Sequence, residues 1–202
     1  MITEAGIIGK IGLNSAGVGV CLNAIRAKGL DAVRIPAHLG LRMVLECSST
    51  NEAVAKLEGV GMASSAHMLI GDGSGDATGF EFTSTTIAKL PVDEQGRIIH
   101  ANHLLLPHKG AIETPWLKDS PERVDRMALL TGQLKTKAPS WKDVSGLFED
   151  QDGLPGAICR SEELPSTSAT LFNIVMDLKR RTAVVRMGKP CNVEEVVDLS
   201  FD

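Results

Sequence analysis

Apolar residues near the start of the chain form continuous runs rather than an alternating pattern. Two such runs, Gly6–Ile11 and Gly17–Leu22, are separated by a turn that contains Gly, Asn and Ser. Continuous apolar runs are typical of strands that are covered on both faces. The pattern therefore predicts a buried hairpin at the start of the chain, with further layers above and below it.

Two helices are predicted after this hairpin, at about His38–Glu46 and Asn51–Leu57. Ser49 and Glu52 have the spacing of a capping box at the start of the second helix. Two more helices are predicted in the second half of the chain. One begins at Ser120 and Pro121, and the other runs from Ser140 through Phe148. The helix that begins at Ser120 is expected to bury one stripe of residues and to expose another. The buried stripe is Val124, Met127, Thr131 and Leu134, and the exposed residues are Arg123, Asp125 and Arg126.

Strands are predicted between and after these helices, because apolar segments alternate with Gly/Asp-rich or charged turns. They are Ala66–Gly73, Gly79–Thr86, Ile87–Val92 and Arg97–Leu106, followed by a closing hairpin of Thr170–Leu178 and Thr182–Met187. The order of strands and helices predicts an α+β fold with sheets between helices. The length of 202 residues suits a single domain, residues 1–202.

Composition narrows the class of protein. A formal charge of −4 gives no reason to expect a nucleic acid or an anionic membrane as partner. No apolar run approaches the ~18 residues of a membrane span, and no signal peptide precedes the first strand. Four cysteines are scattered singly, which fits a reducing compartment better than a disulfide framework. We therefore expect a cytoplasmic protein.

Two clusters that suggest cofactors are better explained structurally. The loop Gly71–Gly75 resembles the start of a dinucleotide-binding motif, but it leads into a predicted strand rather than a helix, so a tight hairpin is favoured. His100, His103 and His108 suggest a metal site. Side chains three residues apart on a strand point to opposite faces, and no further ligands are evident, so we expect neither a metal nor another cofactor.

Three residues are candidates for chemistry. Asn102 lies in an apolar segment, where its amide either bridges strands or donates to an oxyanion in a cleft. Arg160 follows the Ile158–Cys159 pair and either is a solvated loop charge, orients a substrate carboxylate or holds a thiolate. Cys21 is a possible nucleophile, but a buried core cysteine is favoured because no basic residue is adjacent in the sequence.

Several segments in this order resemble a known family. They are Glu4–Ile25, Met68–Phe82 with Asp72 and Glu81, His100–His103, and Asp152–Arg160. Together they are similar to the cysteine-nucleophile peptidase family that includes the fungal isopenicillin N acyltransferases (acyl-CoA:6-aminopenicillanic acid acyltransferases). The similarity covers about Ile2–Pro190.

The resemblance implies a four-layer αββα sandwich of the N-terminal-nucleophile hydrolases. It implies an acyltransferase or amidohydrolase that acts on small amides or acyl-CoA thioesters through a cysteine acyl-enzyme. It also assigns Asn102 to the oxyanion hole and Arg160 to the active site.

One departure from the family is large: the nucleophilic cysteine and an Asn-Trp-Asp stretch precede the hairpin in the family, and nothing here matches them. The fold is therefore expected to be incomplete at its N-terminus, with an N-terminal segment or subunit supplying the nucleophile. The alternatives are a catalytically inactive fragment, a non-enzymatic binding scaffold, or an enzyme that uses Cys21.

Overall fold

The computed structural model describes all residues except Lys135, Lys137 and Asp202. The chain divides into two compact units. The first comprises residues 1–116, the turn Leu178–Arg181 and Phe201, and the second comprises residues 117–177 and 182–200. The prediction of a single domain stays a prediction. None of the helices in the described part of the chain is long and apolar enough to cross a membrane.

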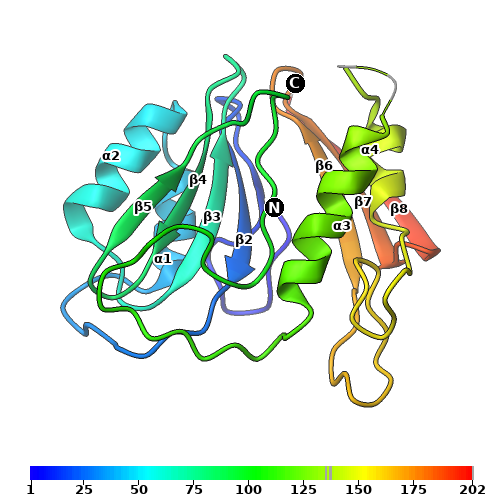
Figure 1. The fold of residues 1–202 in the computed structure, drawn as a ribbon. Helices are drawn as coiled ribbons and strands as arrows, with labels where there is room; N and C mark the ends of the chain where they lie inside the picture. The colour runs from blue at the N-terminus through cyan, green and yellow to red at the C-terminus, as the bar shows by residue number, and fades with distance from the viewer. Residues whose placement is uncertain (135, 137, 202) are drawn as a thin grey trace. The chain divides into compact units, whose positions relative to one another are not determined.

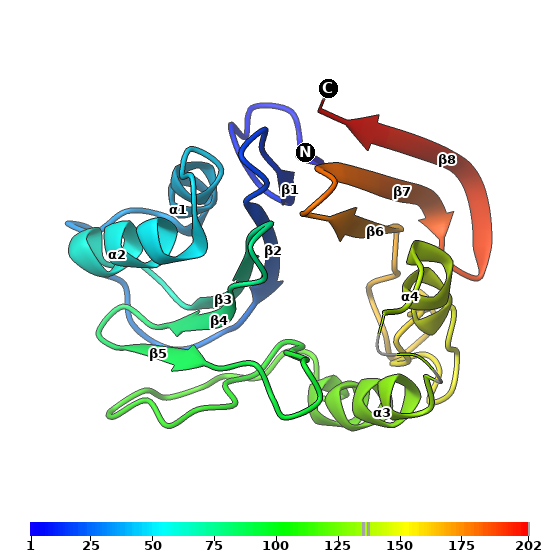
Figure 2. The ribbon, with the colours of Figure 1, turned by 90° about the horizontal axis from the view of Figure 1, so that it is seen from above.

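The first unit is one antiparallel sheet with a helical layer. Its strands, in spatial order, are β1 (Gly12–Leu13), β2 (Gly19–Ala24), β3 (Ala66–Gly71), β4 (Ala77–Phe82) and β5 (Ile87–Leu90). Helices α1 (Ala37–Val44) and α2 (Thr50–Val60) cover one face of this sheet (Figures 1 and 2). The residues after β5 run across the other face (Figure 2). Both faces of the sheet are therefore covered, as the continuous apolar runs predicted.

The core of the first unit lies between the sheet and the two helices. Its fully buried side chains include Leu41 and Leu57 from the helices and Met68, Ile70 and Phe80 from the strands. Burial of a large aliphatic or aromatic side chain contributes roughly 1.5–3 kcal/mol.

A serine cap and a buried carboxylate mark the start of α2. Ser49 accepts a hydrogen bond from the Glu52 amide, as predicted, whereas the Glu52 carboxylate accepts from the amide of Ser48 at 2.7 Å. The capping box is therefore formed in one direction only. At the same helix end, Asp72 accepts a hydrogen bond from the Thr50 amide at 2.7 Å. Burial alone raises the pKa of Asp72, but hydrogen bonds from Ser74 and Thr50 outweigh it and lower that pKa to about 2.

The second unit is an antiparallel sheet with two helices. Its strands follow the order β6 (Phe172–Asp177), β7 (Thr182–Lys189) and β8 (Asn192–Ser200), and its helices are α3 (Ser120–Gly132) and α4 (Trp141–Leu147). Asn173 on β6 joins the sheet to α4, because its amide nitrogen donates to Ser145 O at 3.2 Å and to Ser145 Oγ at 2.9 Å. Ser140 caps α4 in a complete capping box with Asp143.

The α+β class is confirmed, and so are all four helices and most strands. Two strand predictions are wrong. The run Gly6–Ile11 is largely turn and irregular structure, with Gly6 at φ 86° and only an isolated bridge from Ile11 to Ile2. The segment Arg97–Leu106 is irregular because its amides bond to a side chain rather than to a neighbouring strand.

Three further features differ from the sequence predictions. The stripe predicted for α3 is only half-buried where the structure describes it, and Ser120 is the one fully buried residue of this helix. Arg123 and Arg126 form ion pairs with Asp119 and Asp150 instead of facing water alone. Strand β8 was not predicted, because its charged residues mask the alternation that marks a strand.

Candidate active site

A row of polar side chains crosses the sheet of the first unit on the face away from its helices. Asn23, His67 and Glu81 are direct cross-strand neighbours on β2, β3 and β4. Side chains of directly paired residues share a face, whereas the core residues Met68 and Phe80 take the alternate positions. His67 and Glu81 are nevertheless fully buried, so another segment covers them.

That covering segment follows β5 and is gathered by the carboxylate of Glu81. Oε1 accepts hydrogen bonds from the Leu105 amide and from His100 Nε2, both at 2.7 Å. Oε2 accepts from the Leu106 amide at 2.9 Å and from His108 Nε2 at 3.3 Å. Burial alone raises the pKa of Glu81, but these hydrogen bonds outweigh burial and lower that pKa to about 2. Glu81 is therefore a carboxylate that holds four donors of one segment.

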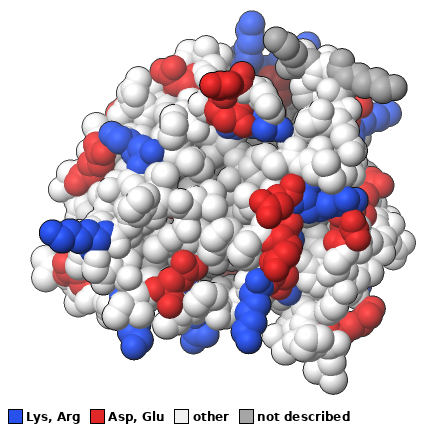
Figure 3. Space-filling view, in the orientation of Figure 1, with Lys and Arg blue, Asp and Glu red and all other residues white. Residues whose placement is uncertain are grey.

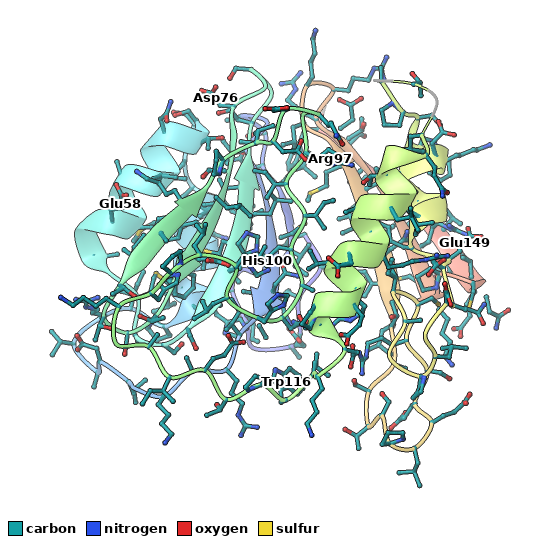
Figure 4. The ribbon with its side chains drawn as sticks, in the orientation of Figure 1. Glu58, Asp76, Arg97, His100, Trp116 and Glu149 are labelled. Atoms are coloured by element: carbon teal, nitrogen blue, oxygen red, sulfur yellow. The ribbon has the colours of Figure 1, made fainter. Side chains whose placement is uncertain are left out.

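His100, labelled in Figure 4, links this segment to the polar row through its contacts with Glu81 and His67. Its Nδ1 faces the carbonyl oxygen of Ala101 at 2.8 Å, while its Nε2 faces Glu81. Both ring nitrogens of His100 therefore lie within hydrogen-bond distance of an oxygen atom. The ring stacks on His67 with 3.6 Å between centroids. Burial, together with the neighbouring His100, lowers the pKa of His67 to about 3, so His67 is neutral at physiological pH.

Asn102 lies between the anchored residues of this segment. Its amide nitrogen donates to the carbonyl oxygen of Ala24, at the end of β2, at 2.9 Å. The residue is half-buried and belongs to an irregular segment, not to the buried strand that the sequence predicted. Asn102 therefore lies on a loop that is bound to Glu81 at two points. His100 bonds to Glu81 before Asn102 in the sequence, and the Leu105 amide bonds to Glu81 after it.

Arg160 lies in the second unit and is held by acceptors. One guanidinium nitrogen forms an ion pair with Asp119, and the other donates to Ser166 Oγ at 3.1 Å. Nε has no hydrogen-bond partner in the described structure, although only 9% of the residue is exposed. A Cβ at Gly156 would lie 2.7 Å from the Asp119 side chain, so only glycine leaves room for this pair. The interpretation of Arg160 as a solvated loop charge is therefore wrong.

A shallow pocket of about 370 Å³ adjoins this ion pair. It is lined by charged residues of α3 and by the loop around Gly153 and Gly156. Its arginines are matched by acids: Arg126, for example, bonds to Asp150 at 2.6 Å and to Asp152 at 3.0 Å. Red and blue side chains accordingly lie together over α3 in Figure 3. The pocket has no excess of either charge that would select an anion or a cation.

The other sequence features considered as functional sites are Cys21, the loop after β3 and the histidines that suggested a metal site. Burial raises the pKa of the Cys21 thiol to about 11, which disfavours a nucleophilic thiolate. The loop after β3 is a tight hairpin to β4, as predicted, with the Asp72 amide bonded to the Asp76 carbonyl at 2.9 Å. Within the part of the chain that the structure describes, no three His, Cys, Asp or Glu side chains are arranged to hold a metal ion.

Comparison with known proteins identifies the family. Residues 1–192 match the family described as acyl-coenzyme A:6-aminopenicillanic acid acyl-transferase. The chain belongs to this acyltransferase family. It is 46% identical over 205 residues to the acyl-coenzyme A:6-aminopenicillanic-acid-acyltransferase 40 kDa form of Emericella nidulans. That alignment covers 100% of this chain and 56% of the relative, so the chain spans just over half of the relative's length.

A solved structure supports the fold expected for this acyltransferase family. Penicillin V acylase from Agrobacterium tumefaciens is similar with a TM-score of 0.59 and 14% identity. The similarity covers 95% of this chain and 65% of the acylase chain. This chain therefore shares the fold of penicillin V acylase. The resemblance inferred from the sequence motifs is therefore confirmed.

Sequence reasoning missed the Glu81 cluster of this acyltransferase-family chain. In the sequence, Glu81 lies in the family-like strand and His100 lies near His108, but no local pattern joins the acid to the two histidines. One signal was present: Glu81 alternates with the apolar Phe80 and Phe82, which places an acid on the opposite face of a buried strand. A buried acid requires partners, and nearby histidines are natural ones.

Proposed function

We propose that this chain forms the larger part of an enzyme that transfers or hydrolyses acyl groups through a cysteine acyl-enzyme. Membership of the acyltransferase family supports the reaction class. The nucleophile in this proposal comes from an N-terminal segment or subunit that is absent from this chain. Burial raises the pKa of Cys21, Cys47 and Cys159, which makes each of them a poor nucleophile.

In the proposed reaction, a cysteine thiolate attacks the carbonyl carbon of an acyl-CoA thioester or a small amide. The carbonyl π electrons move to oxygen, and the oxyanion accepts a hydrogen bond from Asn102. Collapse of this intermediate breaks the C–S or C–N bond, and the leaving group takes a proton from the protonated base. A free α-amino group, with a pKa of ~7.7–8.0, suits that base. An amine or water then accepts the acyl group and frees the thiol.

The single observation that carries the oxyanion role is the placement of Asn102 on an anchored loop. Its amide direction is set by the bond to Ala24, and the loop is held on both sides by Glu81. A donor that is already oriented needs no reorganisation when charge develops in the transition state. Arg160 is proposed to orient a substrate carboxylate or to hold the thiolate, and Asp119 and Ser166 would fix its guanidinium.

The test uses the full-length protein that includes the nucleophile segment. Asn102→Ala should lower turnover of acyl-CoA thioesters and small amides by about 10²–10³-fold, because one oxyanion donor typically contributes that much. The fold, followed by circular dichroism, should be unchanged. Asn51→Ala is the control, because Asn51 is an exposed amide of the same unit.

Unchanged turnover in Asn102→Ala would overturn the oxyanion role. A native product that begins at Met1, co-purifies with no partner and is inert toward both substrate classes would favour the non-catalytic scaffold instead. Intact-mass analysis of the protein from its natural source decides between these cases.

A further inference from the structure

We infer that Glu81 is the positioning residue of the candidate oxyanion donor: it holds the loop that carries Asn102 and acts on the reaction only through that residue. The inference rests on the proposed role of Asn102 for its effect on turnover. Its effect on the loop does not depend on that role. Glu81 itself lies beneath the loop and is fully buried.

The number of donors on one carboxylate supports this inference. Glu81 accepts four hydrogen bonds from the segment between His100 and His108, and each of its oxygens accepts two. Two of these donors are backbone amides, and in this half-buried, irregular segment they bond to Glu81 instead of to a neighbouring strand. A single side chain thus replaces the strand partner that these amides lack.

The location of the anchors links them to Asn102. The His100 anchor precedes Asn102 by two residues, and the Leu105 anchor follows it by three. Besides these two anchors, the side chain of Asn102 itself bonds to the carbonyl oxygen of Ala24 on β2. Since both Glu81 and Ala24 belong to the sheet, the sheet fixes the position of the Asn102 amide.

The chemistry of the site requires a carboxylate in particular. A glutamine at this position retains one oxygen acceptor and places an NH₂ group where the other oxygen accepts two N–H donors. The NH₂ group would then face two N–H donors of the segment, so two of the four hydrogen bonds that hold the segment would be lost. His67, which stacks on His100, bonds through Nδ1 to Asn23 Oδ1 at 2.9 Å, and its Nε2 has no hydrogen-bond partner in the described structure, so His67 holds none of these donors.

Glu81→Gln is therefore compared with Asp72→Asn by hydrogen exchange and mass spectrometry on the 202-residue chain. Asp72 is the matched control, because it is also a poorly exposed carboxylate with a pKa of about 2 that accepts backbone amides, yet it bonds to Thr50 and Ser74 rather than to the loop. We expect amides 100–106 to exchange about 10- to 100-fold faster in Glu81→Gln and unchanged in Asp72→Asn. Unchanged exchange in Glu81→Gln would overturn the inference.

Turnover in the full-length protein distinguishes a Glu81 that positions Asn102 for the reaction from a Glu81 that only stabilises the loop. Glu81→Gln should lower the turnover number more than it changes KM, and adding it to Asn102→Ala should lower turnover no further. Additive losses, or normal turnover despite a released loop, would overturn the positioning role. If Asn102→Ala has no effect on turnover, the oxyanion proposal fails, while the exchange result still decides whether Glu81 holds the loop.

Discussion

The cysteine thiols of this chain have very different surroundings. Burial raises the pKa of Cys21 to about 11 and also raises the pKa of Cys47. Cys191 is exposed, and its Sγ lies 3.2 Å from the Sγ of buried Cys159. Reactivity follows exposure and thiolate content, so these residues should be distinguishable by their chemistry.

Native-state alkylation with iodoacetamide should label Cys191 first and Cys21 slowest. Treatment with oxidised glutathione beforehand should protect both Cys191 and Cys159. The Cys191 thiolate displaces one glutathione, and Cys159 then displaces the second, which leaves a disulfide and two molecules of reduced glutathione. Peptide mapping measures both results. Fast labelling of Cys21 would instead restore the hypothesis that Cys21 is the nucleophile.

At the scale of elements, β2, β3 and β4 combine an apolar face with a polar one. The helix-facing side holds Met68 and Phe80, and the opposite side holds His67 and Glu81. Burial of the polar row is possible because Glu81 is ionised and His67 is neutral. Both states follow from lowered pKa values, so both link folding to pH.

Stability should fall on acidification in two windows. In the unfolded chain His67 binds a proton near its ordinary pKa of 6.5, whereas in the folded chain it binds one only near pH 3. The contribution of neutral His67 to the free energy of unfolding is therefore complete above pH 6.5 and is lost as the pH falls toward 3. The ionised Glu81 carboxylate likewise makes its full contribution to the free energy of unfolding above pH 4.5, and this contribution is lost as the pH falls toward 2. Between pH 6.5 and 4.5, His67→Gln should reduce the slope of unfolding free energy against pH by up to ~1.4 kcal/mol per pH unit.

Urea unfolding at a series of pH values measures this slope. His38→Gln, on α1, is the control for removal of a histidine outside the polar row. Equal slopes in the wild-type protein and His67→Gln would show that His67 is not held neutral by its surroundings.

Elements with local signals were predictable, whereas those without them were not. Ser49 and Ser140 mark the starts of α2 and α4 in both sequence and structure, because a cap needs only residues a few positions away. Arg97–Leu106 has the composition of a strand, yet it pairs with no strand. Its partner is Glu81, which precedes it by more than a dozen residues; the alternation of Glu81 with Phe80 and Phe82 marks a buried acid but does not show which segment that acid binds.

At the scale of the whole molecule, the chain forms two units, but their boundary is not a simple cut in the sequence. The turn Leu178–Arg181, between β6 and β7, belongs to the first unit, whereas both strands belong to the second. A Cβ on Gly19 would lie 2.5 Å from Leu178 Cδ2, so the turn packs closely on β2 and the Leu178 side chain would have to shift if a larger residue replaced Gly19. Such interleaving favours cooperative unfolding of one domain.

The two tryptophans can test this prediction, because Trp116 belongs to the first unit and Trp141 to the second (Figure 4 labels Trp116). Trp116→Phe and Trp141→Phe each leave a single fluorophore. We expect the two variants to unfold in urea at midpoints that coincide with each other and with the circular-dichroism transition. Separate midpoints, with each signal following its own unit, would show two domains instead of one.

The sequence alone determined the α+β class, the four helices, most of the strands and the family, since these depend on local periodicity, capping and ordered motifs. Tertiary structure decided what the polar residues do. It placed Asn102 on a loop rather than in a strand, paired Arg160 with Asp119, and gathered His100 and His108 on Glu81. Partners that lie far apart in sequence meet only when the sheet forms, and buried charge is tolerated only where such partners meet.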